Sequence, residues 1–459
     1  MAEGYRHSPE HKAGKMMIPV LMTGAFLGSL SQNMLASALS AIIDEFSVSA
    51  LVGQWLTTVY LLMVGVVSAL TATLFQRIHT RQLLECSLLL FAAGCLAAII
   101  APSFWTLLIA RAIQAAGAGV LIPVLQMVLI HLYPPEEQGK AMGLSGIVVG
   151  FAPAVGPSLS GVLIDTFGWR SLFVFLALAS IVVALVGIPT FRQVGTTNYQ
   201  PLKLRFAALY GIGFTLVMAS VTLMGGDDMQ PLAVAGMLIA GILILGWFAR
   251  LQLHSSEPLL HLELFGHRSM RMGTILMVLT YTIMTSGTIL VPLYIQSMCR
   301  FSATLSGLAM LPGSLLLAVL SPVAGHLVDL LGIRGVIIAG FAFLLLGTGS
   351  YALVNTDTSL LITTAIYAVR SVGLAFLLMP LQSFAVSGLT LEDADRGMAI
   401  MNSFRQIGGS LCATLLTLVA TALSMSGGLD ITGFRAAGAI SAVAVVAALV
   451  VWCGILRQK

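Results

Sequence analysis

The stretch "GHLVDLLGIR", Gly325–Arg334, ends a long apolar segment and places one carboxylate, Asp329, between two glycines. A similar stretch, "ATLFQRIHTR" at 72–81, follows an earlier apolar segment and has Gln76 in the position of Asp329. An internal repeat of this kind is typical of membrane carriers built from two similar helical bundles. The extent of the repeat therefore decides the fold.

The repeat runs through both halves of the chain. Arg111 in "LLIARAIQAAGAG" is matched by Arg370 in "AIYAVRSVGLA", and "QGKA" at 138–141 is matched by "RGMA" at 396–399. This pattern predicts six helices in each half and two inserted between the halves. The expected domains are an N-terminal bundle at 1–190, the inserted helices with their linker at 191–250, and a C-terminal bundle at 251–459.

The composition excludes a soluble protein. Of the 459 residues, 58% are hydrophobic and 9% are charged, whereas soluble domains have about 25% charged residues. The five cysteines have no metal-ligand spacing, and we interpret them as apolar fillers. The chain is predicted to be an all-α polytopic membrane protein that needs no cofactor and no metal.

Apolar segments long enough to cross a bilayer recur along the chain. Fourteen spans are predicted, at 17–43, 51–74, 83–101, 105–132, 141–164, 171–190, 205–225, 231–249, 271–295, 304–328, 335–354, 359–385, 397–424 and 433–456. With both termini cytoplasmic, the inner segments hold sixteen Lys and Arg residues and the outer loops only three. Because inner loops of membrane proteins are enriched in basic residues, this bias supports the assignment and places Asp227 and Asp228 outside.

The residues at the inner ends of two helices are candidates for a gate. A carboxylate at Asp329 can pair with a basic group or with a helix N-terminus, and Gly325 lets two helices approach. The alternative is an ordinary tight loop. The candidate gating residues are Gly325, Asp329, Gly332 and Arg334 in one copy and Gln76, Arg77 and Arg81 in the other.

Three arginines lie within predicted spans, at Arg111, Arg370 and Arg405. A buried arginine costs roughly 2.5–3.5 kcal/mol on membrane-insertion scales, so each must face the protein interior and be hydrogen-bonded. They either line a substrate cavity or bind backbone carbonyls for structural reasons. Their polar neighbours Gln114, Asn402 and Gln406 belong to the same candidate cavity.

Glycines and prolines are concentrated in "GIVVGFAPAVGPSLSG" at 146–161. Two prolines in one span bend a helix, and the glycines allow a close approach to a neighbour. The alternative is packing alone. The residues that carry the motif are Gly150, Pro153, Gly156, Pro157 and Gly161.

Together these motifs resemble the fourteen-helix drug/proton antiporters of the major facilitator superfamily, over nearly the whole chain. The resemblance rests on 111–119, 152–161, 256–270, 290–312, 325–334 and 402–410, and "QRIHTRQLL" and "AIYAVRSVGLAFLLMP" are most similar to the lincomycin-resistance exporters. It implies proton-driven export of amphipathic compounds. It also implies that Arg111 belongs to the arginine motif of helix 4, and 152–161 to the antiporter motif.

The first span departs from this family. Ser29, Gln32 and Asn33 form a polar stripe at helical spacing that continues to Ala36 and Ser40, and the family's usual carboxylate is replaced by Ser31 and Gln32. The stripe either forms a cavity wall or makes interhelical hydrogen bonds only. Because glutamine does not titrate, we expect proton coupling to be absent or to use a helix end, through Asp44, Glu45, Glu85 or Asp165.

The favoured function is export of neutral or weakly charged amphipathic small molecules, because the midplane has arginines and no carboxylate. Two alternatives stay open, namely a proton-independent facilitator or importer of a polar metabolite, and a membrane sensor that does not transport. An enzyme is not expected, since no nucleophile–base or metal constellation is present. The expected partners are a small substrate, the bilayer of the cell membrane and, if they are coupled, protons. No nucleic acid is expected, and a periplasmic adaptor is open if the host is Gram-negative.

Overall fold

The computed structural model describes residues 9–48, 50–134, 137–195, 204–224, 231–255, 258–424 and 430–457. Within these residues the chain forms fourteen long α-helices and no strand. The long helices are α2 (Pro9–Phe46), α3 (Ala50–Arg77), α4 (Thr80–Ile99), α5 (Phe104–Leu132), α6 (Gln138–Phe167), α7 (Arg170–Thr190), α8 (Leu204–Leu223), α9 (Pro231–Leu253), α10 (Arg268–Leu293), α11 (Ala303–Leu331), α12 (Ile333–Ser350), α13 (Leu360–Val386), α14 (Leu391–Ala422) and α15 (Ile431–Arg457). Three short helical turns are η2 (Leu262–Gly266), η3 (Tyr294–Met298) and η4 (Tyr351–Leu353).

Each predicted span lies on one of these helices, and the prediction of an all-α polytopic membrane protein is confirmed. Among the described residues, ten helices are long and apolar enough to cross a bilayer, and an eleventh is added if the two parts of α2 are one bent span. The number of crossings, fourteen, stays a prediction. The loop with Asp227 and Asp228 lies outside the described residues.

Local sequence explains where several helices begin. Ser103, Ser302 and Ser359 are the N-cap residues of α5, α11 and α13, and each side chain accepts a hydrogen bond from a backbone N–H in the first turn. This bond satisfies one of the donors that a helix start leaves unpaired. Gly332 separates α11 from α12 with φ +81°, a conformation that favours glycine.

The helices form two compact units. Unit 1 contains residues 1–135, 159–267 and 388–407, and unit 2 contains 136–158, 268–387 and 408–459. Two helices are therefore divided, because the first part of α6 packs in unit 2 and the first part of α14 packs in unit 1. The bundle boundaries expected from the sequence repeat stay a prediction.

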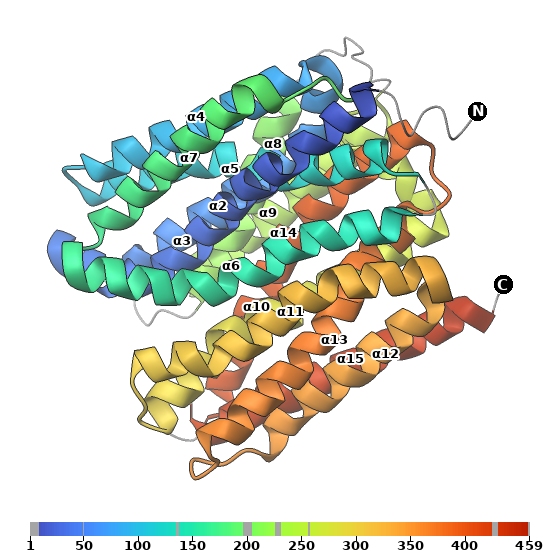
Figure 1. Ribbon diagram of the computed structural model, residues 1–459. Coiled ribbons are helices and arrows are strands. Elements are labelled where there is room, and N and C mark those ends of the chain that lie inside the picture. Colours follow the sequence, from blue (N-terminus) through green and yellow to red (C-terminus); the bar gives the residue numbers. More distant parts are fainter. Residues whose placement is uncertain are drawn as a thin grey trace. The chain divides into compact units, whose positions relative to one another are not determined.

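The same helix contact is built once in each unit (Figure 1). In unit 1, α4 crosses α5 at Gly94, where an added Cβ would lie 2.4 Å from the backbone nitrogen of Gln114. In unit 2, α12 crosses α13 at Gly347, where an added Cβ would lie 2.4 Å from the backbone nitrogen of Arg370. The sequence repeat is thus matched by repeated helix packing.

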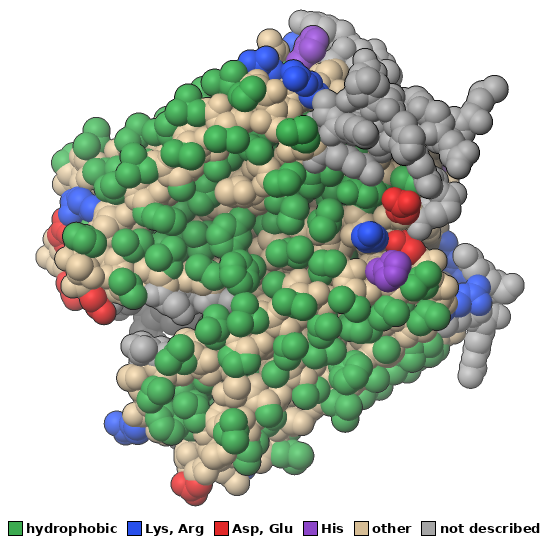
Figure 2. Space-filling model, in the orientation of Figure 1, with side chains coloured by type: hydrophobic (Ala, Val, Ile, Leu, Met, Phe, Trp, Pro, Cys, Tyr) green, Lys and Arg blue, Asp and Glu red, His purple; other side chains and the backbone are tan. Residues whose placement is uncertain are grey.

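The outward side of the helices is apolar. On α7, Leu178, Val182 and Leu185 are 62%, 58% and 61% exposed and share one face of the helix. Figure 2 shows hydrophobic side chains over the middle of the helices on the visible face, with charged side chains near the helix ends. Continuous exposed apolar surface of this extent is suited to lipid.

Candidate functional site

The polar stripe on α2 faces α14 within unit 1. The Gln406 side-chain amide donates a hydrogen bond to the Gln32 side-chain oxygen at 3.1 Å. Asn33 donates instead to the backbone oxygen of Ser29, at 2.8 Å, on its own helix. The side chains of Ala36 and Ser40 lie outside the described residues. Among the described side chains of the predicted stripe, that of Gln32 therefore forms a hydrogen bond with another helix.

A second amide pair continues this cluster along α14. The buried Asn402 side chain donates to the Gln126 side-chain oxygen of α5 at 2.6 Å, and its own oxygen accepts from Arg405 at 3.1 Å. Asn402, Arg405 and Gln406 are all buried in unit 1. We call Gln32, Gln126, Asn402 and Gln406 the amide cluster, which carries hydrogen-bond donors and acceptors but no charge.

Arg111 lies on α5 and is 1% exposed. Its guanidinium donates to the Ser31 hydroxyl of α2 at 2.9 Å and to the Gln114 side-chain oxygen, and it lies 4.1 Å from the ring centre of Tyr60. Two of its nitrogens, Nε and Nη2, have no hydrogen-bond partner among the described residues. The structure thus brings Arg111 together with Gln114, its expected polar neighbour, and with Ser31 of the first helix.

Arg370, the repeat counterpart of Arg111, has a different environment. In unit 2 its guanidinium donates to the backbone oxygens of Ile283 and Met284 on α10, at 3.0 Å for Met284. Gly287 provides the room, because an added Cβ there would collide with the guanidinium. These bonds satisfy carbonyls of α10, so Arg370 has the geometry of a structural arginine.

The candidate gating motif at Asp329 contacts the start of α6 within unit 2. The carboxylate accepts from the backbone N–H of Gly139 at 3.0 Å and from that of Lys140 at 2.8 Å. Gly325 crosses the same turn, where an added Cβ would lie 2.1 Å from the Gly139 oxygen. Of the two partners expected for Asp329, the structure has the helix N-terminus, which favours an anion.

The first copy of the motif has Gln76 in the place of Asp329. Gln76 is buried, and its side-chain nitrogen has no hydrogen-bond partner among the described residues. Arg81 pairs with Glu85 on its own helix at 2.7 Å, Arg77 is half-buried, and Arg334 of the second copy is exposed. The two copies therefore differ in chemistry as well as in sequence.

The glycine- and proline-rich motif packs the first part of α6 on α11. An added Cβ at Gly146 would lie 2.5 Å from the Ser321 Cβ, and one at Gly150 would lie 2.7 Å from the Leu317 Cγ. Further along, Gly161 has nothing within 4 Å, Pro153 is half-buried and Gly156 is buried. The Pro157 side chain lies outside the described residues.

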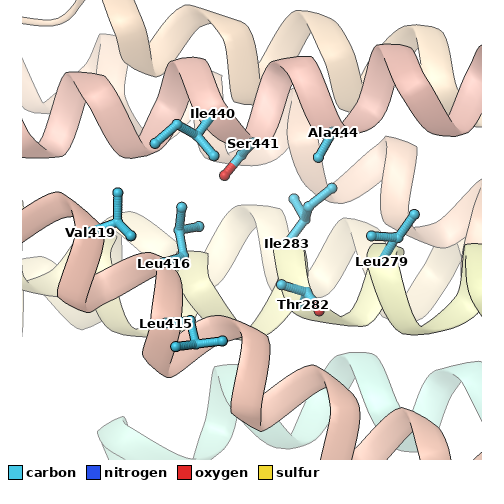
Figure 3. Close-up of a pocket in the computed structure, with 9 residues that line it drawn as sticks. All are labelled: Leu279, Thr282, Ile283, Leu415, Leu416, Val419, Ile440, Ser441 and Ala444. Carbon is cyan, nitrogen blue, oxygen red and sulfur yellow. The ribbon is translucent and has the colours of Figure 1, made fainter. Parts of the chain in front are cut away.

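An apolar cavity of about 250 Å³ lies in unit 2 between α10, α14 and α15 (Figure 3). Its walls are aliphatic except for Thr282 and Ser441, and Figure 3 shows the Ser441 hydroxyl directed toward the space. Drug-sized ligands occupy pockets of about 300–1,000 Å³, so this cavity is suited to the apolar part of a molecule. Sequence reasoning did not find it, since its residues are ordinary helix-packing types.

The carboxylates expected at helix ends are partly committed to ion pairs. Glu45 pairs with Arg170 at 2.7 Å and accepts from the Trp169 indole, and that indole bond is the main reason why the pKa of Glu45 lies below its usual value. The sequence missed Asp395, which is 3% exposed and lies 2.9 Å from His131. The hydropathy of the sequence could not indicate this burial, because Asp395 precedes the predicted span at 397–424.

Long apolar helices around buried, hydrogen-bonded polar side chains define a polytopic membrane transporter. The Major Facilitator Superfamily model matches residues 21–413, and the chain belongs to this family. The family and its solved members are transporters, so the chain is not an enzyme.

The relatives of this chain include a resistance protein. The chain is 32% identical to lincomycin resistance protein LmrB of Bacillus subtilis, over 88% of this chain and 85% of that protein. It is 32% identical to the MFS-type transporter YcnB of the same organism, over 96% and 93% of the two chains. The proton:xylose symporter XylE has the same fold, with a TM-score of 0.67 at 14% identity over 95% of both chains.

Proposed function

We propose that this chain exports amphipathic small molecules across the cell membrane by alternating access, with both termini in the cytoplasm. The observation that carries the proposal is the amide cluster beside Arg111 in unit 1. Amide side chains both donate and accept hydrogen bonds, so they bind polar groups of many geometries without requiring a charge. Relatives that confer resistance to lincomycin, and a multidrug resistance protein B homolog 25% identical over 88% of this chain, support the export direction.

The charges near the cluster favour neutral or weakly charged substrates. Arg111 is 1% exposed, and its described partners Ser31, Gln114 and Tyr60 are uncharged groups. In a medium of low dielectric, a buried guanidinium group repels a dication more strongly than it would in water.

A second candidate is a carrier of a polar metabolite. A riboflavin transporter, RibZ of Clostridioides difficile, is 23% identical over 86% of this chain. The amide cluster favours this alternative as well, because amides match the donor and acceptor edges of heterocycles. The two functions differ in the direction of net transport.

The test is accumulation of radiolabelled lincomycin and riboflavin in a drug-sensitive host that expresses the chain. We expect the wild type to lower the accumulation of lincomycin and Gln406→Leu to leave it at the level of the host without the chain, because leucine removes the amide and leaves a shorter apolar side chain. Gln296→Leu is the matched control, because Gln296 is exposed. Higher accumulation of riboflavin would favour the second candidate, and unchanged accumulation of both compounds would contradict the proposal.

A further inference from the structure

We propose that His131 and Asp395 form a proton-binding site at the inner ends of α5 and α14, in place of the carboxylate absent from α2. The inference rests on the proposed export function and supplies its coupling ion. His131 Nε2 lies 2.9 Å from Asp395 Oδ2, with side-chain exposures of 12% and 4%. Both residues belong to unit 1.

The site has the chemistry of a proton carrier. Among the described acidic residues, Asp395 is the one that is buried, and its Oδ1 has no hydrogen-bond partner there. Burial raises the pKa of Asp395, while the hydrogen bond with His131 opposes the rise. A buried ion without full compensation is costly, so adding or removing a proton changes the local free energy by a large amount.

The groups around the pair leave its charge unbalanced. On α14, Glu392 and Arg396 pair with each other at 2.6 Å, and Arg396 also lies 3.3 Å from Asp393. From α3, Gln76 contributes an uncharged amide and Phe75 packs its ring 5.8 Å from the His131 ring. His261, which pairs with Glu263, borders a second pocket that Gln76 and Arg396 also line.

The protons of the pair can be counted. With a neutral imidazole and an ionised carboxylate, the pair has one proton on the imidazole and a net charge of −1. One further proton gives a pair with no net charge, written either as imidazolium and carboxylate or as imidazole and carboxylic acid, with the shared proton at the 2.9 Å contact. Because the groups share the site, they titrate together and not as independent residues.

A path for the proton is present. A cavity of about 200 Å³ borders His131, Asp395, Gln76, Glu392 and Gly195. This volume exceeds the share of a single water in the liquid, about 30 Å³. Water in this cavity can deliver a proton to the buried oxygen of Asp395.

The comparison with the repeat explains why the site is specific to one copy. Asp329 binds two backbone N–H groups of α6, and that contact needs no proton. In the other copy, Gln76 replaces the acid on α3, while Asp395 stands on α14 and meets a titratable partner. Asp395 precedes Asn402 by seven residues on one helix, which is about 10 Å at 1.5 Å per residue. Protonation of Asp395 can therefore influence the amide cluster through α14.

The experiment is an infrared pH titration of the full chain in liposomes, with lincomycin transport measured on the same preparations. We expect, in the wild type and in Glu392→Gln, a carboxylic-acid band that titrates at higher pH than the exposed carboxylates, because burial raises the pKa of Asp395. The band should be lost in Asp395→Asn, and in His131→Gln its midpoint should rise, because glutamine can donate a hydrogen bond but cannot carry the charge through which His131 stabilises the carboxylate. Asp395→Asn should also reduce gradient-driven lincomycin accumulation by about tenfold or more, while lincomycin exchange without a gradient is retained.

The two proposals fail in different ways. A titrating band that persists in Asp395→Asn, or gradient-driven transport that survives in it, overturns the proton site. Wild-type protein that neither accumulates nor exchanges lincomycin counts against the proposed substrate, and the infrared titration still decides the proton site. Loss of the band in Glu392→Gln would show that the proton binds Glu392 and not Asp395, and would overturn the inference.

Discussion

Replacing Asp329 by Asn tests the contact between α11 and α6. The carboxylate accepts from two backbone N–H groups, at 3.0 and 2.8 Å, at the start of α6. Asparagine keeps one acceptor but loses the charge and one of the two bonds. A hydrogen bond to a charged group contributes about 1.5–3 kcal/mol, and the low end applies because Asp329 is half-buried and screened by water.

A loss of about 1.5 kcal/mol corresponds to a roughly tenfold increase in the population in which this turn is open. Amide hydrogen exchange followed by mass spectrometry measures it directly. The peptide that contains Gly139 and Lys140 should exchange about tenfold faster in Asp329→Asn, and a peptide from α4 should be unchanged. The control is Asp357→Asn, at an exposed acid in the turn before α13. Unaltered protection of Gly139 and Lys140 would refute the assignment of Asp329 as the group that holds α6.

Three further predictions concern other parts of the chain. Arg111→Ala should abolish lincomycin transport by protein that is still inserted in the membrane. Arg111→Lys should restore little transport, because lysine lacks the planar guanidinium that reaches Ser31 and Gln114 together. Wild-type transport rates in Arg111→Ala would contradict this prediction. Gly146→Ala should destabilise the protein by about 1–3 kcal/mol in thermal unfolding, because its Cβ would meet Ser321. Gly161→Ala is the control and should not destabilise it, because Gly161 has open space around it. Equal effects of the two substitutions would disprove the close packing. Ser441→Trp should fill the cavity in unit 2 and weaken binding of the more hydrophobic substrates, as measured by competition with lincomycin; unchanged competition would exclude this cavity from the substrate path.

The helices could be predicted because the length of an apolar segment is a local property. The predicted span 105–132 and α5, Phe104–Leu132, agree almost residue for residue. The start of α14 was harder, since its first six residues, 391–396, are largely polar and hydropathy begins the span at 397. Asp395 falls in that polar turn, which is why its burial was missed.

Side-chain partners were less accessible to sequence reasoning. Arg111 and Arg370 hold matching places in the repeat, yet Arg111 binds side chains and Arg370 binds backbone carbonyls of α10. The repeat fixes the position of each arginine along its helix but not the residues that a neighbouring helix presents to it. One signal for the proton site was available, namely that Gln76 replaces the acid of the motif while Asp395 directly precedes "RGMA" at 396–399.

Transport into inside-out membrane vesicles tests the central claim most directly. The claim is that an uncharged amide cluster, together with the buried guanidinium of Arg111, selects neutral or weakly charged amphipathic molecules for export. Vesicles that contain the wild type should accumulate a radiolabelled uncharged amphipathic antibiotic and should not accumulate a bis-quaternary ammonium dication, and Gln406→Leu should abolish the first activity. Faster accumulation of the dication than of the uncharged antibiotic would contradict the account.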